Sequence, residues 1–376
     1  MALTGVIWLT SCTQPSMASS VQVLATQVVP GSSVYASSLV LSPEGAPLVA
    51  FVSGPPECIV YVWQGGASPE SVGQAGDRRH TEMSISLALA PGGEPGIAYV
   101  DDRVGDLVYA ERDHGRWITM TVDVVGQVGY FASLAYDRAG NPHISYFDNT
   151  NNDVKYAMRQ AKIWRVETID ASGEPGFHIP AGFTRLVLGP DPDDPATRAD
   201  TPQVAYLAYR YKPYDGALRY AVRQPEGWRI ETVDASRSAG GFPALALDAE
   251  GRPWISYYRA GTWDYQVGEL RVARRIEGHW RIDVVDGQDN AGRFNALAFA
   301  PDGRPLIAYY AARTADLRLA WFDRVWRHDT LLSGHDVGSW VTLTVDAQER
   351  AHLTYADGVA RVTTHALVAF PTLSVP

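Results

Sequence analysis

The sequence predicts an all-β protein: a seven-bladed β-propeller of four-stranded antiparallel blades, with the ring closed by the N-terminal strand. Three observations carry this prediction. A repeat of roughly 47 residues runs through the chain, and its first and last copies are incomplete in complementary ways. The composition, with 19 Tyr, 11 Trp, 34 Gly and 24 Pro among 376 residues, favours short strands and tight turns over helices.

Each repeat is marked by a leucine in its first strand. In the clearest unit this strand is Ser133 to Asp137, and three further short strands follow before residue 170. The marker leucines lie 46 to 59 residues apart, at Leu39, Leu87, Leu134, Leu186, Leu245, Leu297 and Leu343. We name the four strands of a unit A to D. Four strands at this period predict blades arranged around an axis.

The turns and outer strands also recur. The A–B turn reads Glu250-Gly251-Arg252-Pro253 in one unit and Asp302-Gly303-Arg304-Pro305 in the next. Glycine allows the positive φ of such a turn, and proline fixes φ where strand B begins. Strand D begins at a tryptophan, at Trp117, Trp164, Trp228, Trp280 and Trp326. Its alternating charges suit an exposed outer edge.

The two chain ends complement each other. The seventh repeat has A and B strands within Val341 to Tyr355 and a C strand at Arg361 to Leu367, but no Trp-led D strand. Val21 to Val29 precedes the first A strand, so we predict that it pairs with the last blade and removes an open edge. Residues 21–370 then form one propeller, after a signal and tether at 1–20 and before a tail at 371–376. Six blades, eight blades and an open β-solenoid are the alternatives.

From Ser38 to about Leu367 the repeat resembles the uncharacterised propeller repeats of bacterial secreted and surface lipoproteins, with the pattern SLALD-x-x-G-x-P-x-ISY. It is also distantly similar to sialidase-like propellers. The sialidase Asp-box is missing, since the nearest turn, Ala300 to Pro305, lacks both the leading hydroxyl and the trailing Trp. The resemblance implies the fold and little about activity, because this scaffold hosts enzymes, lectins and assembly platforms.

Charge and motifs exclude several classes of function. A net charge of −10 argues against nucleic acid as a partner. No run of 18 apolar residues could span a membrane as a helix. The nine histidines lack metal-ligand spacing, and neither a phosphate-binding loop nor a Gly-x-Ser-x-Gly elbow occurs. The segment Asp148 to Asp153 reads as an Asn-rich turn rather than a cation loop. We expect a monomer without metal or cofactor.

The N-terminus resembles a lipoprotein signal. Leu9-Thr10-Ser11-Cys12 matches a lipobox after an apolar run, although no Lys or Arg precedes that run. We expect Cys12 to carry a lipid anchor that holds the protein in the bacterial cell envelope or outside the cell, a chance match being the alternative. Cys58 then has no disulfide partner, and we expect it to be a buried free thiol.

The D–A and B–C loops share one face and differ in every blade, which is where binding specificity is usually built. Three residues before the marker leucine an aromatic side chain recurs, at Phe131, Phe183, Phe242, Phe294 and Trp340. These aromatics form either a collar at the channel mouth, suited to sugars, or ordinary blade-to-blade packing. Their regular recurrence favours packing.

Residues that break the repeat are better candidates for a binding site. They are His80, His178, Arg293 and Trp340 in the D–A loops, and Arg103, Asp148, Tyr211, Tyr214, Trp263 and Asp264 in the B–C loops. Taken one at a time, most of these residues could equally be ordinary solvent-exposed loop residues. We expect the first four near the axis, where Arg293 would bind a carboxylate and Trp340 would stack on a sugar ring.

The leading functional hypothesis is a non-catalytic extracytoplasmic propeller that binds a glycan or a protein. The alternative is a secreted carbohydrate-active enzyme, a glycoside hydrolase or polysaccharide lyase, and a third possibility is a structural role in the envelope. An enzyme would bring two or more titratable groups together in a concave site. A binding protein would instead present aromatic and neutral polar groups there.

Given a complete signal peptide, Cys12 should be lipidated in a bacterial host. A lipoprotein cysteine carries two or three acyl chains, enough for stable anchoring. Mass spectrometry of the membrane fraction measures the modification, and an unmodified Cys12 in a soluble product would contradict the prediction.

Overall fold

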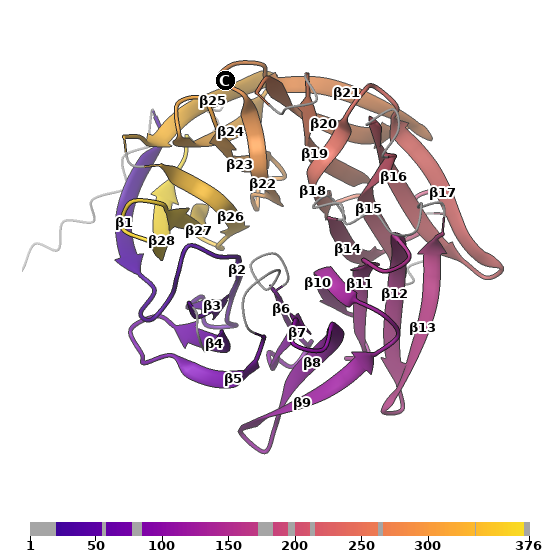
Figure 1. The fold of residues 1–376 in the computed structure, drawn as a ribbon. Coiled ribbons are helices and arrows are strands. Elements are labelled where there is room, and N and C mark those ends of the chain that lie inside the picture. Colours follow the sequence, from indigo (N-terminus) through magenta and orange to yellow (C-terminus); the bar gives the residue numbers. More distant parts are fainter. Residues whose placement is uncertain are drawn as a thin grey trace, which may run out of the picture.

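The protein is a seven-bladed β-propeller, as the repeat predicts. The computed structural model describes residues 20–54, 58–76, 85–171, 183–194, 200–210, 215–261, 266–334 and 336–371. Within these residues, 28 strands form seven four-stranded antiparallel sheets around a common axis (Figure 1). No helix long and apolar enough to cross a membrane occurs in the described part of the chain.

Every blade runs from an inner strand A to an outer strand D. Blades one to three are β2 (Ser37–Leu41), β3 (Pro47–Val52), β4 (Ile59–Gln64), β5 (Glu70–Gln74); β6 (Ile85–Leu89), β7 (Pro95–Asp101), β8 (Asp106–Asp113), β9 (Arg116–Asp123); and β10 (Val128–Tyr136), β11 (Pro142–Asp148), β12 (Asp153–Gln160), β13 (Ile163–Asp170). Blades four and five are β14 (Thr184–Gly189), β15 (Thr201–Arg210), β16 (Asp215–Gln224), β17 (Gly227–Asp234); and β18 (Ala239–Leu247), β19 (Pro253–Ala260), β20 (Gly268–Ile276), β21 (His279–Asp286). Blades six and seven are β22 (Ala291–Phe299), β23 (Pro305–Ala311), β24 (Asp316–Asp323), β25 (Val325–Leu332); and β26 (Val337–Val345), β27 (Arg350–Asp357), β28 (Val362–Ala369), completed by β1 (Gln22–Val28).

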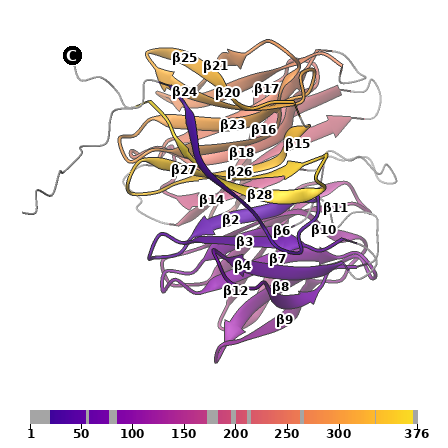
Figure 2. The same cartoon turned by 90° about the vertical axis from the view of Figure 1, so that its left-hand side faces the viewer.

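The N-terminal strand closes the ring. β1 pairs antiparallel with β28 from Gln22–Ala369 to Val28–Thr364 and supplies the missing outer strand of blade seven (Figure 2). The Val29 N–H extends the pairing by donating to the Thr363 carbonyl at 2.9 Å. The predicted closure is therefore confirmed.

Buried polar contacts join neighbouring blades. At four interfaces the last residue of a D strand is an aspartate that binds a strand B tyrosine and a strand C cation of the next blade. The sets are Asp123 with Tyr146 and Lys155, Asp170 with Tyr206 and Arg219, Asp234 with Tyr257 and Arg271, and Asp286 with Tyr309 and Arg318. In the third set, the Tyr257 hydroxyl lies 2.6 Å and the Arg271 Nη1 2.9 Å from Asp234 Oδ2. A carboxylate so deeply buried needs both partners.

These contacts lower the pKa of two of the aspartates, Asp123 and Asp234. Burial alone would raise the pKa of Asp234, but hydrogen bonds from Ser236, Tyr257 and Arg271 outweigh it and hold that pKa below its ordinary value. At Asp123, hydrogen bonds from Lys155 and Tyr146 outweigh burial in the same way. Both carboxylates therefore stabilise the fold above their unfolded pKa, and this stabilisation is lost as the pH falls through the folded pKa.

The interface beside the closure contains a buried histidine pair. His352 Nδ1 lies 3.2 Å from His365 Nε2, and His352 Nε2 lies 3.2 Å from Asp346 Oδ2. The fully buried Trp63 of blade one packs against His365, with ring centroids 6.3 Å apart. Burial, and then the neighbouring His352, lower the pKa of His365 to about 4.

Deleting Val21 to Val29 should destabilise the protein, because β28 would become an open edge. A lower melting temperature and increased light scattering are expected, with a chain that begins at Ser20 as the control. Equal melting temperatures for the two chains would contradict the closing role of β1.

The protein should lose stability between pH 7 and pH 5. Over this range an unfolded His365 takes up a proton, whereas the folded one, with a pKa of about 4, does not. The His365→Gln variant should therefore lose about 1–2 kcal/mol less than the wild type over the same range. Urea titrations at both pH values measure the difference, and His279→Gln, at an exposed position on β21, is the control. Identical pH profiles for wild type and His365→Gln would contradict the assignment.

Candidate functional site

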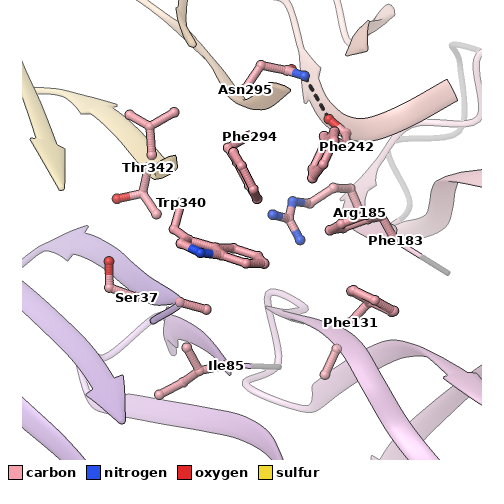
Figure 3. Close-up of a pocket in the computed structure, with 13 residues that line it drawn as sticks. Ser37, Ile85, Phe131, Phe183, Arg185, Phe242, Phe294, Asn295, Trp340 and Thr342 are labelled. Atoms are coloured by element: carbon pink, nitrogen blue, oxygen red, sulfur yellow. Dashed lines mark hydrogen bonds between the residues drawn. The ribbon is translucent and has the colours of Figure 1, made fainter. Parts of the chain in front are cut away.

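A cavity lies on the propeller axis at the end where the inner strands begin, on the face of the D–A and B–C loops (Figure 3). Five aromatic side chains and Arg185 line it, together with neutral polar and small apolar residues, among them Ser37, Asn295 and Thr342. It offers about 60 Å³ to the centres of water molecules, against about 10–15 Å³ for a single water. The cavity therefore has room for several water molecules, or for part of a sugar.

The aromatic side chains form a continuous arc around the axis. From Phe131 through Phe183, Phe242 and Phe294 to Trp340, successive ring centroids are 4.4, 4.6, 4.5 and 4.5 Å apart. Trp340 also packs against apolar clusters formed by blades one and two and by blades three and four. These rings pack against one another and also line the cavity, so the two sequence-based interpretations describe one arrangement.

Bulges in the inner strands direct the aromatics to the axis. The register of β10, β18, β22 and β26 against strand B shifts twice just before the marker leucine. The aromatic residue at each bulge has a positive φ, namely 52° at Phe131, 51° at Phe242, 48° at Phe294 and 54° at Trp340. A bulky residue in this conformation costs of order 1–3 kcal/mol, so the surrounding structure must hold it there.

A glycine makes each bulge possible. Gly292 has a φ of 105°, and a Cβ there would lie 2.8 Å from the Leu270 Cα of the preceding blade. Gly129, Gly240 and Gly338 meet a strand C leucine of the preceding blade in the same way. Only glycine satisfies both the φ and the space.

The bulge glycines contact the preceding blade, and at two bulges a polar side chain of the following blade binds the aromatic residue's carbonyl. The Thr184 hydroxyl donates to the Phe131 carbonyl at 3.0 Å. The Asn295 amide donates to the Phe242 carbonyl at 2.8 Å (Figure 3). Blades four and six thus fix the aromatic residue of the blade before them.

Arg185 is the one ionisable side chain among the described residues that line the cavity. Its guanidinium points into the cavity between Phe294, Phe183 and Trp340 (Figure 3). Its side chain is exposed to the channel but surrounded by the blades. The resulting loss of contact with bulk water lowers the pKa of Arg185 below its ordinary value. An arginine nevertheless stays charged in a protein.

Arg185 replaces a structural serine. In blades one to three the residue before the marker leucine is Ser38, Ser86 or Ser133, whose hydroxyl oxygen accepts a hydrogen bond from the marker leucine N–H of the next blade at 2.9, 2.9 and 3.0 Å. The same position in blade four is Arg185, which makes no such bond in the described structure. Its Nη1 donates to the Thr184 carbonyl at 3.2 Å, and no carboxylate of the described residues lies within 4 Å of it.

Arg185 is not among the predicted site residues, because departures from the repeat were expected in the loops. The available signal lay inside the inner strands. Aligned on the marker leucine, the preceding residues read Ser, Ser, Ser, Arg, Ala, Ala and Thr from blade one to blade seven.

Two of the four residues predicted near the axis belong to the described part of the structure. Trp340 lines the cavity. Arg293 does not, since its guanidinium lies over the Tyr258 ring of the preceding blade, 5.6 Å from the centroid. His80 and His178 lie outside the described residues.

The B–C loop candidates that the structure describes have local roles away from the cavity lining. Arg103 forms an ion pair with Asp101 at 2.6 Å. Asp148 is buried and accepts the Thr150 and Asn151 N–H groups at 3.0 and 3.1 Å, so this segment is a turn. No cluster of three or more metal-ligating side chains occurs among the residues described. Tyr211, Tyr214, Trp263, Asp264 and the proposed lipidation site Cys12 lie outside that part of the chain.

No family model matches this sequence, and no curated protein does either. Several solved structures are similar in fold. A protein of unknown function from Dyadobacter fermentans DSM 18053 aligns with a TM-score of 0.56 and 11% identity over 94% of this chain and 100% of its own. A PL25 ulvan lyase bound to -[GlcA(1-4)Rha3S]- gives a TM-score of 0.60 and 13% identity over 94% and 96%. The BP39L lectin from Burkholderia pseudomallei gives 0.58 and 14% over 86% and 96%. At these sequence identities, the similarity shows only that the chain shares the β-propeller fold of these proteins.

Proposed function

We propose that this propeller binds carbohydrate at the axial cavity and does so without catalysis. The lining of the cavity carries the proposal. Its described residues include five aromatic side chains, neutral polar groups and one cation, and none of the others is titratable. Aromatic faces bind the apolar faces of sugars, and a few fixed polar groups orient them.

Catalysis of glycosidic cleavage needs different groups. Hydrolysis takes a pair of carboxyl groups and lyase chemistry takes a base near the sugar, in both cases with proton transfer at the reacting atoms. Arg185 keeps its proton at neutral pH, and its aromatic neighbours cannot exchange one. The described lining is thus suited to holding a ligand in place.

The structural neighbours support a carbohydrate as the ligand. They include a lectin and a polysaccharide lyase that holds a glucuronate-containing oligosaccharide. The lyase favours a second candidate, a carbohydrate-active enzyme with its site at the same cavity. The two candidates differ in whether the bound polysaccharide is cleaved.

The lipobox-like segment ending at Cys12 supports a location in the bacterial cell envelope or outside the cell. A lipid anchor there would tether the ring next to the membrane surface, where its loop face could meet polysaccharides from outside the cell. Anchoring and binding are separate parts of the proposal, and the mass-spectrometric test addresses the first alone.

The protein should bind members of a glycan and polysaccharide array without releasing product. Trp340→Ala should weaken binding several-fold, because an aromatic contact is worth about 0.5–1.5 kcal/mol beyond its buried area and about 1.4 kcal/mol is tenfold in affinity. The matched control is Trp254→Ala, which removes a ring that packs on Phe299, away from the cavity.

Reducing ends and ultraviolet-absorbing unsaturated uronates are assayed on the same array. Release of either product by the wild type would replace the binding proposal with the enzyme. Absence of any glycan bound would reject both.

A further inference from the structure

The charge at the axis serves no visible purpose in the fold. Arg185 stands where the serines of blades one to three bond to the next blade, and it gives up that bond. The protein carries a net charge of −10, and ion pairs hold many of its arginines. Within the described structure Arg185 has no such pair.

A cation partly removed from bulk water gains from a counter-charge, even where aromatic rings lie beside it. Removing a charged group from bulk water carries a solvation penalty that a paired and hydrogen-bonded anion offsets. The lowered pKa of Arg185 has this same physical cause. A serine or alanine at position 185 would suit the fold better, so the arginine points to a ligand.

The geometry limits what that ligand can be. A guanidinium is a planar fork that pairs with a carboxylate through two parallel hydrogen bonds. The cavity, at about 60 Å³ for water centres, admits a substituent of a few atoms while the sugar that carries it stays at the mouth.

We infer that the axial cavity binds the carboxylate of an acidic sugar, with Arg185 as its anchor. This inference rests on the carbohydrate-binding function proposed above and names the class of ligand. The neutral Asn295 and Thr342 line the same cavity and present no competing charge. A sulfate ester would offer the same negative charge in a tetrahedral, bulkier form.

Calorimetric titration with matched oligosaccharides tests the inference. The probes are galacturonate, glucuronate and mannuronate tetrasaccharides, each paired with its methyl ester, and a sulfated neutral tetrasaccharide. The wild type should bind at least one free acid more tightly than its ester. It should bind the sulfated probe more weakly than that acid.

The central variant is Arg185→Met, which keeps the length of the side chain and removes its charge. It should weaken binding of the preferred acid about 10- to 150-fold, the equivalent of about 1.5–3 kcal/mol for hydrogen bonds to a charged group. Binding of the ester should change less than twofold. Arg185→Lys, a point charge without the fork, should lie between the two.

The matched control is Arg313→Met, which removes a cation from the same face. Arg313 is exposed, pairs with Asp289 and does not line the cavity, so its loss should leave the preference for acids intact. Melting temperatures separate a ligand role from a structural one. Arg185→Met should keep or raise the melting temperature, since it removes a charge that has no carboxylate partner among the described residues, whereas loss of a structural arginine would lower it.

Several outcomes would overturn the inference. They are equal binding of acids and esters, tighter binding of the sulfated probe, an undiminished acid preference in Arg185→Met, or loss of that preference in Arg293→Met instead. In each case the carbohydrate-binding function itself survives. It fails only if neither charged nor neutral glycans bind, which the array reports independently.

Discussion

A buried carboxylate at the end of an outer strand holds one blade against the next at four interfaces of the ring. Asp234 shows the arrangement: a tyrosine and an arginine of the following blade bind the same carboxylate oxygen. An unpaired buried charge is strongly destabilising. The two blades are therefore held at the relative position in which all three groups contact one another. The spacing of the blades, and with it the width of the channel, follows from these contacts.

The inner ends of the blades depend on that spacing. Each bulge glycine needs the backbone of the preceding blade close by, as Gly292 does against Leu270. Strained backbone persists where its surroundings over-determine it. The positive φ of Phe294 is fixed by the glycine contact on one side and by ring packing on Phe242 and Trp340 on the other. A rigid aromatic arc at the axis is the result.

Arg185 is the one charged residue at its position in the seven repeats. A protein commonly gives up local stability at the place where it binds a ligand. Blades four, five and six all lack the serine hydroxyl that joins the inner strands of blades one to three, but blade four alone replaces it with a cation, which points into the cavity. The ring therefore supplies the rigidity, and one substitution in its repeat supplies the chemical identity of the site.

Sequence alone determined the blade number, the strand order within each blade and the closure by β1. These features are written in local spacings, such as the marker leucines and the missing Trp-led strand of the last repeat, and each can be read without knowing its neighbours in space. The sequence also pointed to Trp340, because the aromatic recurs at a fixed distance from the leucine. It did not separate Arg293 from Arg185. A β-bulge changes which face of the strand a residue occupies, so Arg293 lies over Tyr258 while the next residue, Phe294, reaches the axis. Which side chains meet in the cavity was decided only by the tertiary structure, since that meeting depends on the rotation of each inner strand at its bulge and on contacts between blades far apart in the chain.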